Sequence, residues 1–396
     1  MRFSVVMPTH NRLHLLRDAI ETVRRQDFAD WELVVFDNAS RDPIREHVQS
    51  LRDERIRYFR SDEFLPVSSS WNEAIGRARG DYVILLGDDD GLTPRYFTGV
   101  DAIIAKFGDP EVVYSNIYQF WHPGVAPWEP SGYLIDVRHG FFFKGRDQPF
   151  LLSEEDAKRA ARDSIRLSIS FSFNSQAIMY RRSFLRTLSA DGPVYRSPFP
   201  DYYIANVALA RSKSTLVIPQ PIAIAGVSRA SFGYTMYNSQ EKEGAALLNT
   251  KLETDPVYLS IERELLPGPS YTTNFVVAME YVARALPELN ERVDYRKYRR
   301  VQVCAVFRAI LSGEHSADLW LQVRHKLSPW ERVWASCAWF VLSRAGRSGR
   351  MRKHVLERLD KILSMSGSDP MVRHCGKHSF SRVTELYDAL SAGTLS

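Results

Sequence analysis

The sequence predicts an α/β protein, with a mainly parallel sheet flanked by helices over residues 1–239 and a helical, basic region over residues 240–396. Short apolar runs alternate with amphipathic helical patterns in the first part, which is typical of βαβ units and a Rossmann-like sheet. Only helical patterns follow the polar stretch Asn238–Gly244, so we place the boundary there. Three carboxylates, Asp88–Asp90, directly follow one of the apolar runs. Open α/β sheets bind ligands at such positions, just past the carboxyl ends of their strands.

The first part begins with four predicted strands joined by helices. The apolar runs that predict strands are Phe3–Met7, Trp31–Phe36, Ile56–Phe59 and Tyr82–Leu86. The helical patterns between them are Arg12–Gln26, Arg45–Leu51 and Ser70–Arg79, the last of which we expect to end at Gly80. This alternation predicts parallel strands with right-handed crossovers. The residues that follow each strand should therefore meet at one edge of the sheet.

The polar residues at this edge suit a nucleotide diphosphate. They are Pro8, Thr9, His10, Asn11 and Arg12 after the first strand, Asp37, Asn38 and Ser40 after the second, Ser61 and Asp62 after the third, and Asp88, Asp89 and Asp90 after the fourth. Three adjacent carboxylates repel one another in a semi-buried cleft unless a cation lies among them. Oxygen ligands favour Mg²⁺ or Mn²⁺. The alternative is an acidic turn exposed to solvent.

Later segments of the first part are less regular. We expect helices at Tyr96–Lys106, Ala157–Ile165 and Ile204–Ala210, strands at Val112–Ser115, Ala177–Tyr180, Leu216–Ile218 and Ile222–Ile224, and a polar loop at Ser228–Tyr237. Residues 118–170 form an excursion rich in aromatic side chains, including Tyr118, Phe120, Trp121, Trp128, Tyr133 and Phe141–Phe143. These aromatic rings either pack in the core or line a surface for the acceptor. Asp201 begins a predicted helix, where a carboxylate can cap unpaired N–H groups.

The basic charge of the chain lies in its C-terminal region. Residues 290–396 contain 19 Lys and Arg against 10 Asp and Glu, whereas the rest of the chain contains 33 against 37. We expect helices at Phe275–Leu286, Tyr298–Leu311, Ala317–Lys326, Pro329–Ser343 and Arg352–Met365. The segment Trp330–Lys353 is rich in tryptophan and flanked by arginines. Its uncharged run is too short to span a bilayer, so it either lies on an anionic membrane surface or packs in a core with solvated arginines.

Length, cysteine content and the first residues limit the class of protein. A chain of 396 residues that is 44% hydrophobic can bury a large core. The segment Met1–Pro8 has no apolar run of signal-peptide length, and the three cysteines are too far apart in sequence for a zinc site or a disulfide framework. We therefore expect a cytoplasmic protein, with contact to the inner membrane face as an option. The basic residues are spread over several helices, which argues against nucleic acid as a partner.

The residues assembled above resemble those of family 2 glycosyltransferases, which are inverting enzymes of the GT-A fold that use nucleotide sugars. The resemblance rests on Val5–Arg12, Asp37–Ser40, Trp71-Asn72, Gly80–Tyr82, Gly87–Asp90 with its DXD-like carboxylates, and Pro94. It covers about the first 235 residues and leaves the C-terminal region unassigned. One departure is that Gly87 stands where the commoner family pattern has an aspartate.

The resemblance implies a role for each matching residue. Pro8, Thr9, Asn11, Arg12, Asn38 and Asn72 would hold the nucleotide sugar, Asp37 would accept a hydrogen bond from the nucleobase, and Asp88 would serve the ribose or the metal. Asp89 falls on the principal metal ligand, with Asp90 beside it. Asp201 falls on the catalytic base. These roles imply metal-assisted transfer of a sugar to a hydroxyl of a glycan or lipid-linked acceptor.

Two other classes of function fit the same sequence. One is a non-catalytic module that binds nucleotides or glycans on the same fold. The other is an adaptor that meets a membrane surface through the basic region after residue 240.

Overall fold

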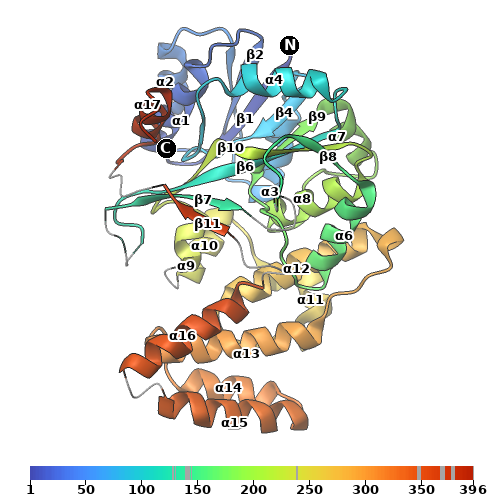
Figure 1. Cartoon of the computed structure of the whole chain (residues 1–396), viewed down its shortest axis with the longest axis vertical. Coiled ribbons are helices and arrows are strands. Elements are labelled where there is room, and N and C mark those ends of the chain that lie inside the picture. The colour runs from blue at the N-terminus through green and yellow to red at the C-terminus, as the bar shows by residue number, and fades with distance from the viewer. Residues whose placement is uncertain are drawn as a thin grey trace.

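The computed structural model describes residues 1–126, 129, 131–138, 143, 145–237, 240–345, 349–365, 371–375 and 380–395. In these residues a single eleven-stranded sheet organises the N-terminal part, and a group of helices extends from one side of it (Figure 1). The predicted α/β fold class with a mostly parallel central sheet and a helical C-terminal region is confirmed.

The parallel half of the sheet has the order β3-β2-β1-β4. Its strands are β1 (Phe3–Thr9), β2 (Trp31–Asp37), β3 (Ile56–Arg60) and β4 (Tyr82–Leu85), and the connecting helices are α1 (Leu13–Arg24), α2 (Ile44–Ser50) and α3 (Val67–Ile75). Every residue of β1, β2 and β4 is buried, as expected for central parallel strands. The edge predicted to gather the polar residues is therefore formed.

One expected helix end is wrong. Helix α3 ends before Gly76 rather than at Gly80. Gly80 instead lies against β1, where a Cβ atom would come within 2.6 Å of the backbone nitrogen of Ser4. The glycine therefore permits close approach of two backbones and does not cap the helix.

The second half of the sheet mixes directions. The central strand β9 (Ile178–Arg181) runs antiparallel between β4 and β6 (Val112–Trp121), and β10 (Thr215–Val227) runs parallel to β6. The shorter strands β5 (Gly91–Leu92), β7 (Tyr133–Arg138) and β8 (Phe150–Leu152) pair antiparallel with their neighbours. The helices of this half are α4 (Tyr96–Lys106), α6 (Glu154–Ile165), α7 (Arg182–Leu188) and α8 (Pro200–Arg211).

Strand β10 was expected as two separate strands. Its pairing with β6 shifts register between Ile218 and Ala223, around Pro221. A bulge accommodates the proline, which has no N–H for the ladder, so the strand continues where the sequence suggests a break. The predicted loop at Ser228–Tyr237 is also partly wrong, because α9 (Phe232–Tyr237) is helical.

The aromatic excursion is partly strand and partly core. Tyr118, Phe120 and Trp121 continue β6, and the ring of Trp121 stacks on that of Tyr133 with centroids 5.2 Å apart. Phe120, Trp121 and Phe143 are buried, which favours the core interpretation for these three residues. Trp128, Phe141 and Phe142 lie outside the described residues.

The helical region contributes to two cores. Its helices are α10 (Glu241–Leu248), α11 (Pro256–Ile261), α12 (Ser270–Ala285), α13 (Tyr295–Ser312), α14 (Asp318–Lys326), α15 (Pro329–Ala345) and α16 (Gly349–Leu363). Helix α12 packs against α6 and α8 and shares the core of the sheet. Helices α13–α16 enclose a separate core around Phe307 and Trp320. The domain boundary near residue 239 stays a prediction.

The last described residues return to the sheet. Strand β11 (Met371–His374) pairs antiparallel with β7, and α17 (Val383–Ser391) packs on α1 (Figure 1). Arg382 donates two hydrogen bonds to the carboxylate of Asp18, one of them 2.9 Å long from Nε. Leu386 is buried with Phe120 in a small core. The end of the described chain is therefore an integral part of the α/β unit.

This packing predicts that Leu386→Ala lowers the free energy of unfolding by about 2–5 kcal/mol, because a buried leucine leaves a cavity when it is truncated. Denaturant unfolding would measure the change. Leu259→Ala removes the same atoms from an exposed position on α11 and should change stability by less than about 0.5 kcal/mol. Equal effects of the two substitutions would contradict the docking of α17.

Candidate active site

The acidic turn after β4 is buried. Asp88, Asp89 and Asp90 all have little or no exposed surface, so the solvated-turn alternative is excluded. The N–H of Gly87 donates a hydrogen bond of 2.6 Å to Oδ2 of Asp90. A Cβ atom on Gly87 would lie 2.5 Å from that same oxygen. The glycine at this position is therefore required by the tight turn that folds Asp90 back onto it.

Asp88 is held by the loop after β1. Its Oδ2 accepts a hydrogen bond of 2.6 Å from the hydroxyl of Thr9 and lies 3.1 Å from Nε of Arg12. Its Oδ1 is buried without a hydrogen-bond partner. Burial raises the pKa of Asp88 to about 6, although the charge of Arg12 opposes this shift. One oxygen of this carboxylate is therefore free to receive a ligand.

Asp90 is occupied by the protein itself. Its Oδ2 accepts from Gly87 and from the side-chain amide of Gln176, and its Oδ1 accepts from the N–H of Gly226 at 2.8 Å. Burial and the neighbouring charge of Asp89 raise the pKa of Asp90 to about 8, and its hydrogen bonds oppose the shift. Asp90 therefore ties the turn to β10 and to the segment before β9.

Asp89 faces the loop after β10. Its Oδ2 accepts a hydrogen bond of 2.8 Å from the hydroxyl of Ser228, and its Oδ1 has no hydrogen bond to another described residue. The backbone of β10 lies so close that a Cβ atom on Gly226 would come within 1.8 Å of the Asp89 carbonyl oxygen. Only glycine fits at this crossing.

The acidic turn offers few ligands for a metal. Among the described residues no group of three His, Cys, Asp or Glu side chains is arranged to hold an ion. The atoms on offer are Oδ1 of Asp89 and the unpartnered Oδ1 of Asp88. Mg²⁺ is commonly held by one or two carboxylates together with substrate phosphates. The residues present therefore fit a cation that takes most of its ligands from a bound diphosphate.

Asp37 lies at the end of β2 and is held by three groups. It accepts hydrogen bonds from the N–H of Ser40 at 2.7 Å, the hydroxyl of Tyr58 at 2.6 Å and the guanidinium of Arg60 at 2.5 Å. Burial favours the neutral acid, but these hydrogen bonds outweigh it and lower the pKa of Asp37. Tyr58 and Arg60 were missed in the sequence. Their period-two spacing on β3, beside the predicted Asp37 turn, was the available signal.

The predicted nucleotide-binding loops are tied to one another. Asn11 has a left-handed backbone with a φ of 54°, donates its N–H to Ser40 at 2.9 Å and accepts the N–H of Arg41 at 2.6 Å. The side chain of Asn38 holds both backbone polar groups of Leu65. Pro8 is buried at the end of β1, beyond the last residue that pairs with β4. The loops after β1, β2 and β3 therefore form one assembly.

Asn72 is placed elsewhere, on α3. Its side-chain amide donates to the carbonyl of Tyr195 at 2.8 Å, and its oxygen accepts the N–H of Tyr195 at 3.0 Å. This pair of hydrogen bonds connects α3 to the segment before α8. The side chain of Asn72 therefore holds the segment that leads into α8.

Asp201 lies in the first turn of α8, whose N-cap is Phe199. The expectation that Asp201 caps the helix is therefore corrected, since Pro200 already has helical geometry. Among the described residues the carboxylate has no hydrogen bond or ion pair to any other residue. Burial raises its pKa to about 6, and its own backbone N–H opposes the shift. Burial raises the pKa values of Tyr180 and Tyr195, and the charge of Asp201 adds to both shifts.

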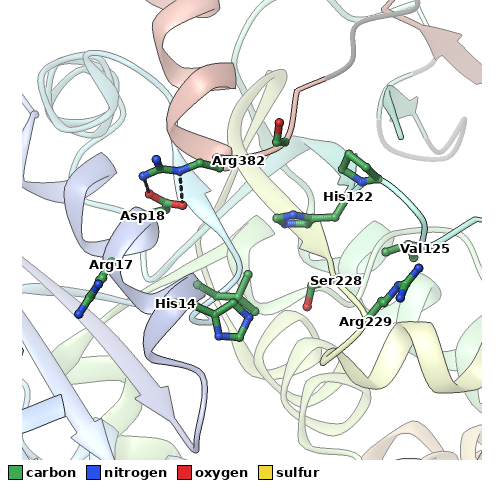
Figure 2. A pocket seen from close by; sticks show the side chains of 11 residues that line it. His14, Arg17, Asp18, His122, Val125, Ser228, Arg229 and Arg382 are labelled. Carbon is green, nitrogen blue, oxygen red and sulfur yellow. Dashed lines mark hydrogen bonds and ion pairs between the residues drawn. The ribbon is translucent and has the colours of Figure 1, made fainter. Parts of the chain in front are cut away.

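A pocket of about 490 Å³ lies between α1, the end of β6 and the loop after β10, and Figure 2 shows the side chains that line it. Its lining comprises His14, Leu15, Arg17, Asp18, His122, Pro123, Val125, Ser228, Arg229, Ser381 and Arg382. Ser228, which binds Asp89, connects the pocket to the carboxylates. Burial lowers the pKa of His122, and its Nε2 is buried without a hydrogen-bond partner. Sequence reasoning missed His14 and His122, which lie on elements that meet only in the folded chain.

A mostly parallel central sheet with buried carboxylates at its carboxyl edge agrees with the GT-A fold class expected from the sequence. Residues 4–186 match the sequence model of the family described as Glycosyl transferase family 2. This part of the chain is therefore similar to that family, as the resemblance implied.

Two relatives and one solved structure illustrate the similarity. The GalNAc(5)-diNAcBac-PP-undecaprenol beta-1,3-glucosyltransferase of Campylobacter jejuni is 38% identical over 94 residues, which are 23% of this chain and 30% of that protein. The UDP-Glc:alpha-D-GlcNAc-diphosphoundecaprenol beta-1,3-glucosyltransferase WfgD of Escherichia coli is 32% identical over 87 residues, 22% of this chain and 34% of that protein. The chain thus spans about a third of the length of both relatives. A crystal structure of S. aureus TarS with UDP aligns with a TM-score of 0.44 and 15% identity, over 91% of this chain and 92% of that one.

The close crossing of β10 over the acidic turn predicts that Gly226→Ala lowers the free energy of unfolding by about 2–4 kcal/mol, since the new methyl group overlaps the Asp89 carbonyl. Denaturant unfolding followed by circular dichroism would measure it. Gly99→Ala is the matched control, because no atom lies within 4 Å of a Cβ at that helical position. It should be neutral or stabilising by up to about 1 kcal/mol. Similar stabilities for both variants would show that the crossing is not tight.

Proposed function

We propose that the protein is an inverting glycosyltransferase that moves a sugar from a nucleotide-diphosphate sugar to a hydroxyl of a glycan or glycolipid. The observation that carries this proposal is the set of buried carboxylates and Arg12 at one sheet edge, inside the segment that matches the family. Asp37 is proposed to accept a hydrogen bond from the nucleobase, at the end of β2 where Ser40, Tyr58 and Arg60 hold its carboxylate. Asp88 is proposed to serve the ribose or the cation.

The proposed metal site is Asp89, with Asp88 beside it and Asp90 as the residue that fixes the turn. This division follows from the hydrogen bonds, because both oxygens of Asp90 are engaged and one oxygen of each neighbour is not. Bound there, Mg²⁺ or Mn²⁺ would offset the negative charge that develops on the leaving diphosphate. Arg12 lies 3.1 Å from Asp88 and adds a fixed positive charge at the same edge.

Asp201 is the proposed base. It would take the proton of the acceptor hydroxyl while that oxygen forms a bond to the anomeric carbon and the bond to the nucleoside diphosphate breaks, with inversion. A pKa of about 6 suits this role, because the carboxylate is more basic than an exposed aspartate and still ionised near neutral pH. The absence of a competing ion pair among the described residues keeps the carboxylate available.

The acceptor we propose is lipid-linked. The two named relatives act, by their names, on sugars carried by diphosphoundecaprenol, and one of them uses UDP-glucose. UDP sugars are therefore the first donors to test. A lipid-linked acceptor places the reaction beside a membrane, and we propose the cytoplasmic face.

The proposed base predicts that Asp201→Asn lowers turnover by about 10²–10⁴-fold and leaves binding of the donor sugar intact. Turnover of the unchanged protein should fall as the pH drops below about 6, where Asp201 gains a proton. The exposed Asp191→Asn is the matched control and should keep full activity. Unchanged turnover in Asp201→Asn would reject the base, and bound donors without turnover in the unchanged protein would favour the non-catalytic alternative.

The same substitution carries a stability readout with a defined sign. Because burial raises the pKa of Asp201 above its unfolded value, the folded state is penalised as pH rises from about 4 to about 6 and remains so above. Asp201→Asn removes that penalty, so the variant should be more stable at pH 8, by up to about 3 kcal/mol, and the gain should shrink at pH 4. Thermal unfolding at both pH values would measure this difference.

The proposed metal site predicts that Asp89→Ala and EDTA each reduce transfer by about 10²-fold or more, because the charge on the leaving diphosphate is then poorly offset. A thermal-shift assay with UDP and Mn²⁺ gives an independent readout, since a ligand that binds only the folded state raises its stability. Asp191→Ala, which removes an exposed carboxylate outside the candidate site, should behave as the unchanged protein. Activity that survives both EDTA and Asp89→Ala would remove the metal from the mechanism.

A further inference from the structure

Helix α15 is apolar on two opposite faces. One face packs into the core of α13–α16 through Trp334, Ala335 and Trp339. The other face carries Trp330, Val333, Phe340 and Val341, which are 83%, 59%, 57% and 62% exposed. These positions recur at helical spacing and form one stripe along the helix. An apolar face of a helix is normally buried against another element, whereas this stripe has no covering surface among the described residues.

Exposed apolar side chains are concentrated in the segment of the chain that contains α15. Of the eleven large hydrophobic side chains that the described residues expose, seven lie within residues 318–363. They are Leu321, Trp330, Val333, Phe340, Val341, Met351 and Ile362. A contiguous apolar stripe such as that of α15 marks a surface that binds a partner or a membrane, whereas scattered exposed residues need no explanation.

Positive charge is concentrated in the same segment. Residues 318–363 contain ten Lys and Arg against four Asp and Glu, a net charge of +6, while the whole chain carries +5. One of the four acids, Glu331, is engaged by Arg299 at 2.8 Å. The guanidinium of Arg344 lies 3.5 Å from the ring centre of Phe340. Apolar and cationic groups are therefore interleaved, as at the interface between lipid headgroups and acyl chains.

We propose that the stripe of α15 binds the surface of an anionic membrane. Its apolar side chains would enter the headgroup region, and Arg324, Lys326, Arg332 and Arg344 would contact lipid phosphates. No helix in the described part of the chain is long and apolar enough to span a bilayer, so the contact lies on the surface. Figure 1 shows α14 and α15 at the end of the molecule farthest from α2 and β2, so this contact leaves the sheet edge uncovered.

A second copy of the chain is the less suitable occupant. Pairing two such stripes would bring two segments of net charge +6 together, which is unfavourable at low ionic strength. Anionic headgroups supply the opposite charge instead, at about 1 kcal/mol for each Lys or Arg near the surface. Charge complementarity therefore selects the membrane.

The test is co-sedimentation with lipid vesicles in the absence of nucleotide sugar, so its outcome does not depend on whether the chain transfers sugar. We expect the unchanged protein to bind vesicles that contain phosphatidylglycerol and to bind phosphatidylcholine vesicles weakly. Trp330→Ala combined with Phe340→Ala should reduce binding by about tenfold or more, because two aromatic anchors are lost. Both side chains are exposed, so thermal unfolding should be unchanged.

The matched control is Leu151→Ala combined with Leu259→Ala, which removes two exposed apolar side chains from other surfaces and should bind vesicles as the unchanged protein does. Arg324→Gln combined with Arg344→Gln should weaken binding and reduce its dependence on salt. Equal binding to neutral and anionic vesicles would overturn the proposal. Full vesicle binding by the variant with Trp330→Ala and Phe340→Ala would also overturn it. A dimer in solution that this double substitution abolishes would show that a second copy of the chain covers the stripe, and would overturn the proposal as well. Hydrolysis of a donor sugar in vesicle-free solution should be the same in all these variants, which separates this outcome from that of the proposed reaction.

Discussion

The burial of three adjacent carboxylates is the constraint on which the rest of the α/β unit depends. Asp88, Asp89 and Asp90 are each held by a different segment, namely the loop after β1, the loop after β10, and both β10 and the turn before β9. Unpaired charges at this depth would destabilise the fold by several kcal/mol. These segments must therefore meet at the turn. Gly87 and Gly226 allow this, because a Cβ atom on either would overlap with Asp90 or Asp89.

Carboxylates at the same edge of the sheet have pKa values shifted in opposite directions. At Asp37 three hydrogen-bond donors outweigh burial and lower the pKa, so the ionised carboxylate stabilises the fold. At Asp88 and Asp90 burial prevails and the pKa values rise, so ionisation is costly in the absence of a further cation. Asp88 also keeps one buried oxygen without a partner. This incomplete compensation is what distinguishes a site prepared for a ligand from a carboxylate that serves only structure.

The sequence could predict what is local. The four parallel strands and their helices follow from apolar periodicity, and the acidic turn follows from its place behind a strand. The partners of that turn could not be predicted, because Gln176 and Ser228 are 86 and 139 residues away from Asp90 and Asp89. The continuous β10 was missed because a bulge around Pro221 hides its continuity. Gly80 was predicted to end a helix, but it allows the backbone to lie close to β1. Glycine is favoured in both situations, so the sequence does not distinguish them.

The region after residue 240 packs in two different places, on the sheet through α17 and in a separate core through α13–α16. Its composition alone could not show this division. In its last described helix, α17, the side chain of Val383 contacts Gly91, the residue after Asp90. A Cβ atom on Gly91 would lie 2.8 Å from Cγ2 of Val383. Its helices α13–α16, by contrast, have a core of their own and hold the apolar stripe away from the sheet. The excess positive charge lies in the segment of α14–α16 and not in α17. It therefore belongs to the surface of the helical group and not to the α/β unit with the candidate site. A charge imbalance between two halves of a sequence thus becomes interpretable once the packing shows which helices are covered and which remain exposed.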